Sequence, residues 1–178
     1  MDSQVRLLIA ATILILPSAG QIPRAPDVEA QRAAMKKLAF LNGRWSGEAR
    51  LYRGSEPVEL VQTEDAQYKV DGLVLTIEGI GRRKKDNSNV LHAFGVISYD
   101  DAGGVYRMRA YNDGRWLETE IQIVEEGRAI KWGFATGPVR TSSILRINEG
   151  GEWTEHTDLT LGSGPARTLM ELAVKPQR

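Results

Sequence analysis

From Gly43 to the end of the chain, turn signals recur about every ten residues, and the segments between them alternate apolar and polar side chains. Glycine beside asparagine or aspartate, between two alternating segments, is the strongest short-range signal for a β-hairpin. Nine turns, of this kind or of related kinds rich in glycine, proline, asparagine and aspartate, divide this part of the chain into ten expected strands. The expected ranges are 44–53, 57–70, 73–83, 90–99, 104–111, 115–124, 128–135, 138–148, 152–161 and 166–175.

Strands joined only by short hairpins form an antiparallel meander. An open sheet of this size would leave two edges and a wide apolar face exposed, and closure removes both. The sequence therefore predicts an all-β fold, a roughly ten-stranded antiparallel up-and-down barrel. Barrel diameter grows with strand number, and about eight strands already leave room for one small ligand. We expect a larger interior here, unless bulky side chains fill it.

The segment before the barrel predicts one short helix. Asp27 can cap a helix over residues 28–38, which are rich in strong helix formers, and Asn42-Gly43 would end it. We expect this helix to lie across one mouth of the barrel. Residues 21–42 then form a leader and N-terminal helix, and residues 43–178 form the barrel domain.

The first twenty residues resemble an export signal. Their apolar run, Leu7–Leu16, is about half the length that a membrane-spanning helix needs. Ser18 and Gly20 provide small residues three and one positions before a cleavage ahead of Gln21. We expect a signal peptide over residues 1–20 and a periplasmic or secreted protein with no membrane attachment after cleavage. A retained anchor and a packed first helix are the alternatives.

The overall charge and the residue types exclude several classes of partner and chemistry. The chain has 23 basic and 23 acidic side chains, so no long-range field gathers nucleic acid or an anionic membrane surface. Zero cysteines exclude disulfides, thiol catalysis and thiolate zinc sites. We therefore expect no nucleic-acid partner, no metal and no cofactor.

The candidates for catalysis are few. His92 and His156 are expected to be ordinary strand residues. Glu118 and Glu120 are two residues apart on one strand, so their carboxyl groups emerge on the same side, as an acid–base pair for glycoside chemistry would require. The same spacing is common on solvated strand faces, and no nucleophile elbow is present. A barrel enzyme that uses Glu118, Glu120 or His156 is one alternative function.

One short stretch carries a resemblance to known proteins. Gly43-x-Trp45, at the start of the first expected strand, resembles the signature of lipocalins and the wider calycin barrels. That resemblance implies that Trp45 closes one barrel end and that Arg167, from the last strand, packs over its ring. The pattern Leu41-Asn42-Gly43-Arg44-Trp45-Ser46-Gly47, followed by a meander, is similar to an uncharacterised bacterial calycin-like family, distantly related to the haem-binding nitrobindin barrels. The resemblance covers residues 38–175.

The chain departs from the haem-binding members of that group. Those proteins resemble one another in a histidine late in the last strand, and the expected strand 166–175 has no histidine. Without such an axial ligand, haem has no evident anchor, so haem binding is not expected.

Aromatic and basic residues on several strands are the candidate ligand contacts. Tyr111, Trp116 and Trp132 would contribute to an apolar lining. Arg107 and Arg109 share a face of one strand. If that face is inward, one of them pairs with an acidic ligand; if it is outward, both are solvated.

These observations lead to one main interpretation and one alternative of a different class. The main one is an exported barrel that binds a small apolar or amphipathic molecule non-covalently, without catalysis. The alternative is a packed barrel that serves as a protein-interaction module or homodimer. Its contact surface would be the strand 91–99, whose two faces are both largely apolar.

Overall fold

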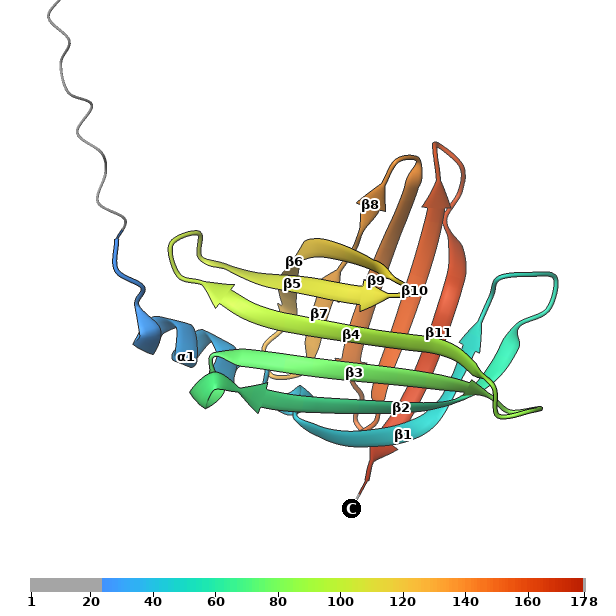
Figure 1. Ribbon diagram of the computed structural model, residues 1–178, viewed down its shortest axis with the longest axis horizontal. Coiled ribbons are helices and arrows are strands. Elements are labelled where there is room, and N and C mark those ends of the chain that lie inside the picture. The colour runs from blue at the N-terminus through green and yellow to red at the C-terminus, as the bar shows by residue number, and fades with distance from the viewer. Residues whose placement is uncertain (1–23, 178) are drawn as a thin grey trace, which may run out of the picture.

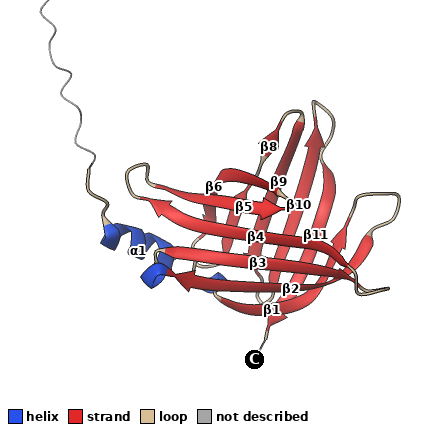
Figure 2. Ribbon diagram, viewed as in Figure 1, coloured by secondary structure: helices blue, strands red, loops and turns tan. Residues whose placement is uncertain are grey.

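A computed structural model describes residues 24–177 of the chain (Figure 1). It is an antiparallel β-barrel with one short α-helix at the start, as Figure 2 shows by colour. The predicted signal peptide, residues 1–20, lies outside the described residues. Within residues 24–177, no helix is long and apolar enough to cross a membrane.

The strands follow one another around the barrel in chain order. They are β1 (Gly43–Leu51), β2 (Val58–Lys69), β3 (Val74–Arg83), β4 (Asn89–Asp100), β5 (Val105–Asn112), β6 (Arg115–Glu125), β7 (Ala129–Trp132), β8 (Ala135–Thr136), β9 (Val139–Ile147), β10 (Trp153–Leu161) and β11 (Arg167–Pro176). The first strand pairs with β11 as well as β2, and β9 pairs with β10, so the sheet closes on itself. The predicted ten-stranded meander is confirmed.

The expected strand 128–135 is broken in two. Its parts, β7 and β8, both pair with β9 and share one position in the barrel. At the break, a Cβ atom on Gly133 would collide with the backbone oxygen of Thr141. The side chain of Thr141 accepts a hydrogen bond from the backbone N–H of Phe134 at 3.1 Å, so a side chain replaces a ladder bond at this point.

The pairing between β6 and β7 is short. It covers only the last part of β6, from Gln122 to Glu125. The earlier part of β6 pairs with β5 alone among the described strands. The seam between β6 and β7 is therefore closed by strand pairing only at the end where β6 finishes.

The N-terminal helix α1 (Val28–Lys36) begins where the sequence predicts. The side chain of Asp27 caps it by accepting a hydrogen bond from the backbone N–H of Ala30 at 3.0 Å. The helix ends at Lys36, two residues earlier than expected, because a separate 3-10 turn, η1 (Ala39–Leu41), leads into β1.

The segment from α1 through η1 closes one end of the barrel. Met35, Leu38 and Leu41 have no exposed surface. Two tyrosine hydroxyls hold the end of the helix: Tyr68 donates to the backbone oxygen of Met35 at 2.5 Å, and Tyr106 donates to that of Ala34 at 2.8 Å. The expected helical plug is therefore present, and below we call residues 28–41 the plug.

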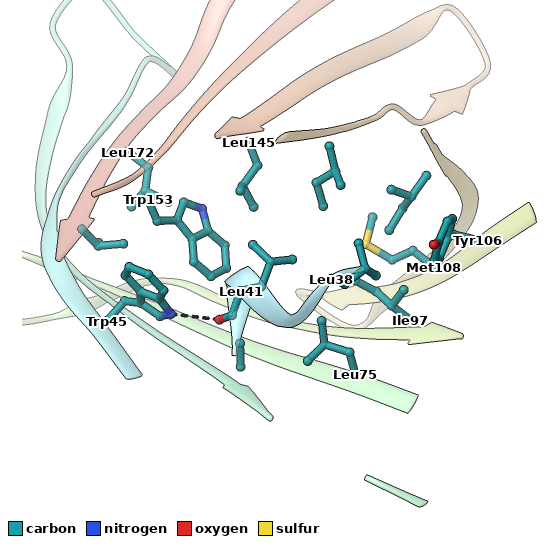
Figure 3. Packing of buried hydrophobic residues seen from close by; sticks show 14 of the residues in the cluster. Leu38, Leu41, Trp45, Leu75, Ile97, Tyr106, Met108, Leu145, Trp153 and Leu172 are labelled. Atoms are coloured by element: carbon teal, nitrogen blue, oxygen red, sulfur yellow. Dashed lines mark hydrogen bonds between the residues drawn. The ribbon is translucent and has the colours of Figure 1, made fainter. Parts of the chain in front are cut away.

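Two tryptophans form the layer next to the plug (Figure 3). The rings of Trp45 on β1 and Trp153 on β10 pack edge to face, with centroids 5.7 Å apart. The indole N–H of Trp45 donates to the backbone oxygen of Leu41 at 3.0 Å. This hydrogen bond ties the plug to the barrel wall.

A candidate ligand cavity with an acidic floor

The barrel holds a cavity of about 680 Å³. Leu145 and Ile130 line its inner part, while Asn112 and Arg115 line it at the end away from the plug. Most of the lining is apolar. Small-molecule sites in proteins usually have this volume range and this character, with a few convergent polar groups.

The polar groups in the inner part of the cavity gather on β2, β9 and β10, where Glu64, Ser143, Glu155 and Thr157 line it and Gln62 is buried beside Glu64. On β2, the amide nitrogen of Gln62 donates to Oε1 of Glu64 at 2.7 Å. On β10, the hydroxyl of Thr157 donates to Oε1 of Glu155 at 3.3 Å, and it also shares a hydrogen bond of 2.8 Å with Ser143 on β9. We call these five residues the acidic floor.

Strand register brings the two carboxyl groups together. Glu64 is directly opposite Trp45 in the β1–β2 pair, and Glu155 is two residues beyond Trp153 on the same inward face of β10. Since the two tryptophan rings are in contact, the two glutamates converge on the layer next to them. The floor therefore lies between the tryptophan pair and the open end of the cavity.

Burial shifts the proton affinity of both glutamates. It raises the pKa of Glu64 from 4.5 to about 8; the hydrogen bond from Gln62 opposes this shift, and the nearby charge of Glu155 adds to it. Burial likewise raises the pKa of Glu155 from 4.5 to about 7, opposed by the hydrogen bond from Thr157. Both groups therefore exchange protons near neutral pH. They can donate hydrogen bonds to a bound molecule, accept them, or pair with a cation.

Glycines on the neighbouring strands make room for the floor. Gln62 has a glycine as its partner on each side, Gly47 on β1 and Gly81 on β3. Glu64 lies opposite Gly79. A Cβ atom on Gly79 would be 2.8 Å from Oε2 of Glu64, and one on Gly81 would be 2.6 Å from Oε1 of Gln62. The missing side chains thus leave space that the two polar side chains occupy.

Two buried polar atoms at the floor have no hydrogen-bond partner among the described residues. They are Oε1 of Gln62 and the indole nitrogen of Trp153. An unsatisfied buried group costs about 1–3 kcal/mol. Both side chains are at least 98% buried, with 1% of Gln62 and 2% of Trp153 exposed. One atom is an acceptor and the other a donor, so the floor has unused capacity for a polar group.

The structure places one of the predicted ligand contacts inside the cavity and another at its rim. Trp132 lines the wall together with Phe134. Tyr111 is at the rim, but its side chain shares the outer face of β5 with Arg107 and Arg109, and the residue is 41% exposed. The structure does not bring Arg107, Arg109 or Trp116 to the cavity.

The inward interpretation of Arg107 and Arg109 is therefore wrong. On β5 the inward positions are those of Tyr106 and Met108, which are buried, and the arginines alternate with them. Arg107 binds Asp100 at 2.9 Å on the outer face. Arg109 binds Glu118 at 2.6 Å. An acidic ligand in the cavity has no access to either guanidinium group.

Trp116 also lies on the outer face. Its ring is 58% exposed, and the guanidinium of Arg109 stands over it at 4.8 Å from the ring centroid. Its partner in the sheet is Tyr111. The cation–π contact that the structure shows in this region is therefore external and does not involve Trp45.

The signature residues of the first strand are only partly arranged as the resemblance implies. Gly43 starts β1 with a φ of 136°, and Trp45 is buried at the closed end. Arg167 starts β11, whereas the β11 residue paired with Trp45 is Pro176, nine residues away. At about 3.3 Å per residue, this separation is roughly 30 Å. Arg167 thus lies at the opposite end of the barrel, and Trp153 takes the place of the expected arginine beside Trp45.

The other residues considered for catalysis are on the outside of the wall. His92 pairs with Glu78 at 2.8 Å, and His156 pairs with Asp158 at 3.0 Å. Glu120 contacts Arg107 at 3.5 Å. Across residues 24–177, no group of three or more histidine, cysteine, aspartate or glutamate side chains is arranged to hold a metal ion.

The sequence pattern does not mark Glu64 and Glu155 as site residues. Their strands contain polar residues on both faces, so alternation alone does not mark them as inward. A usable signal is present in the glycines. Gly79 and Gly81 are two residues apart on one strand, so both are on the same face, and Gly47 shares a face with Trp45 in the same way. Glycines inside a strand indicate that a side chain from a neighbouring strand occupies the space in front of them.

Comparison with known proteins supports the fold. No family model matches the chain, and no curated protein matches it. Among solved structures, the chain is similar to the crystal structure of Rv2717c from M. tuberculosis, with a TM-score of 0.62 and 15% sequence identity. The match covers 82% of this chain and 98% of that one. At this identity the likeness shows a shared β-barrel fold, and the calycin and nitrobindin relationship stays a prediction.

Proposed function

We propose that this protein is an exported binding barrel that holds a small apolar or amphipathic molecule non-covalently in its cavity. The observation that carries the proposal is a cavity of about 680 Å³ in a barrel that the plug closes at one end. In a barrel whose interior served only for packing, we expect side chains to fill this volume, because voids in cores are destabilising. Apolar burial of the ligand supplies about 25 cal/mol per Å².

The first test looks for a carried ligand. The protein is purified from its native host and its mass is measured by native mass spectrometry before and after denaturation. We expect an extra mass that is lost on denaturation, and the size of that mass identifies the ligand. Apo-protein at monomer mass, together with no binding of any apolar or amphipathic probe, would overturn the proposal.

A variant that fills the cavity links the extra mass to the interior. Ala93 lines the cavity from β4, and the preceding residue, His92, is on the outer face of the same strand. We expect Ala93→Phe to lose the extra mass, because the new ring occupies part of the cavity. The matched control is His92→Phe, which adds the same ring outside and should retain the ligand. Loss of the ligand in both variants would count against an interior site.

A second candidate function has its own observation. Phe94, Tyr111 and Trp116 are direct neighbours across β4, β5 and β6, and they form a row on the outer face. The three side chains are 38%, 41% and 58% exposed. Exposed aromatic groups that are adjacent favour a contact with another protein, including a second copy of this chain. Native mass at twice the monomer mass, reduced to monomer mass by Trp116→Ser, would support this interaction module.

A further inference from the structure

Resting on the proposed binding function, we propose that the ligand is an amphipathic amine whose ammonium group binds Glu64 and Glu155 while its apolar part extends toward the mouth. This goes beyond a general apolar ligand, because it states the charge and the orientation of the bound molecule.

The charges in the inner part of the cavity are all of one sign. Glu64 and Glu155 face the interior, and the cations that line the cavity are Arg53 and Arg115. Arg53 follows the end of β1 and Arg115 begins β6, so both lie at the mouth. The described residues supply no hydrogen bond or ion pair from a cation to either floor carboxyl group. A ligand that brings a positive charge provides the partner that the protein omits.

The unsatisfied atoms show that the floor suits a polar group. The acceptor Oε1 of Gln62 has no donor, although its amide nitrogen already binds Glu64. An ammonium group carries three N–H donors, enough for one carboxyl group on each side and for this amide oxygen once the Gln62 side chain turns toward the cavity. The indole N–H of Trp153, whose ring lines the same cavity, is also unpartnered, but it is a donor and an ammonium group provides no acceptor for it. A purely hydrocarbon ligand would provide no donor for Glu64, Glu155 or Gln62.

Other ligand classes fit the floor less well. A carboxylic acid would add a third acidic group beside Glu64 and Glu155, and the arginines once expected to receive it, Arg107 and Arg109, are bound to acids outside the wall. An alcohol can form hydrogen bonds with the floor but cannot neutralise a carboxylate. Toward the mouth the cavity wall is apolar, with Leu51, Leu91 and Leu169 in its lining, so the rest of the ligand is hydrocarbon in character.

The test uses three probes with the same ten-carbon tail, namely decylamine, decanol and decanoic acid. Binding to the purified protein at pH 7.5 is measured by isothermal titration calorimetry. We expect decylamine to bind at least ten-fold more tightly than decanol, and decanoic acid to bind more weakly than decanol. Equal affinities for the amine and the alcohol would overturn the inference and leave the proposed function standing. No binding of any of the three would overturn both.

Variants assign the preference to the floor. In Glu64→Gln/Glu155→Gln we expect the amine to lose its ten-fold advantage, while the affinity for decanol stays within two-fold. Glu120→Gln is the matched control, because Glu120 is an exposed glutamate on the outer face of β6. It should keep the full preference. A preference for the amine that survives the double substitution would overturn the assignment.

A measurement on the unmodified protein does not depend on whether the double variant folds. Alkylammonium groups lose their proton only near pH 10, so at pH 7 the amine enters as a cation and displaces protons from the floor. Titrations in two buffers with different ionisation enthalpies should therefore report proton release for decylamine. They should report none for decanol. Absence of proton release with the amine would contradict binding at Glu64 and Glu155.

Discussion

A buried carboxyl group without a cation costs stability when it is ionised, because it has lost the hydration that it has in the unfolded chain. Glu64 is only 8% exposed, and the groups facing it are Gln62 from its own strand and the acidic Glu155 from β10. Neither provides a positive charge. The fold alone does not explain this residue, and the proposed amine ligand would provide the missing positive charge.

This environment makes stability depend on pH in a definite direction. The pKa of Glu64 is about 8 in the folded protein against an ordinary value of 4.5, so the folded state binds the proton more tightly. The protonated Glu64 side chain adds its largest amount to the free energy of unfolding below about pH 4.5, and this amount is lost as the pH rises through 8. Each unit of pKa difference corresponds to about 1.4 kcal/mol, so the loss amounts to several kcal/mol.

We therefore expect the free energy of unfolding to decrease between pH 5 and pH 8.5, and Glu64→Gln to reduce that decrease. Urea unfolding at several pH values measures both quantities. Glu155 retains part of the dependence in the variant, because its pKa is also raised, to about 7. The control Glu120→Gln should follow the unmodified protein. An unchanged pH dependence in Glu64→Gln would contradict the burial argument.

For single residues, the sequence predicted the inward direction of aromatic side chains in the barrel wall better than that of polar ones. Trp132 alternates with Lys131 and Gly133, so its inward direction is plain. On β2, by contrast, the outward Val61 is apolar and the inward Gln62 is polar, so the hydrophobic pattern gives the wrong face there. The direction of Arg107 and Arg109 could not be predicted for a similar reason. A ligand cavity can contain charged residues, so their charge alone did not place them on the outer face.

Among the elements, the contact between β1 and β11 is unusually close at one point. Gly47 has no side chain, and a Cβ atom at that position would collide with the backbone oxygen of Ala173 and lie 2.8 Å from Cα of Val174. Backbone atoms of a paired strand cannot move aside as a flexible side chain can. The two strands would have to separate to accept even a methyl group.

We expect Gly47→Ala to destabilise the protein by about 3 kcal/mol, at the upper end of overpacking costs. Thermal or urea unfolding measures the loss. Gly54→Ala is the control, since nothing lies within 4 Å of a Cβ atom there and the change should be close to neutral. A loss below about 0.5 kcal/mol for Gly47→Ala, within the range of ordinary surface substitutions, would show that the seam can relax.

The plug is the second element with a measurable contribution. Leu38 has no exposed surface and joins α1 to η1 at the closed end of the barrel. Truncation of a buried leucine costs about 2–5 kcal/mol, depending on how far the surroundings collapse. We expect Leu38→Ala to fall in this range in urea unfolding, and Lys36→Ala, on the exposed side of α1, to change little. Equal effects would mean that the plug does not pack as the structure describes.

Most of the elements follow from local chemistry, which is why they could be predicted. Turn residues such as Asn112-Asp113-Gly114 set the hairpins, and they do so without any long-range contact. The break between β7 and β8 could not be predicted this way, because it depends on the approach of Thr141 from the next strand. The position of Arg167 relative to Trp45 likewise depends on register around the whole barrel.

At the scale of the molecule, one wall separates two chemically different surfaces. The inner surface has an acidic floor and apolar sides, and the outer surface has ion pairs and an exposed aromatic row. Trp132 and Trp116 represent these two sides, since Trp132 lines the cavity and Trp116 is solvent-exposed beneath Arg109. Both were candidate ligand contacts from the sequence, and only their position relative to the wall distinguishes them.

This separation gives a prediction that compares the two residues directly. We expect Trp132→Ala to weaken binding of the decylamine probe about ten-fold or more, because a large apolar contact with the ligand is lost and each ten-fold corresponds to about 1.4 kcal/mol. We expect Trp116→Ala to leave that affinity within two-fold, because the barrel wall lies between its ring and the ligand. Titration calorimetry of both variants at one pH measures the two effects. If Trp116→Ala weakened binding and Trp132→Ala did not, the probe would bind on the outer aromatic row, and binding in the cavity would be contradicted.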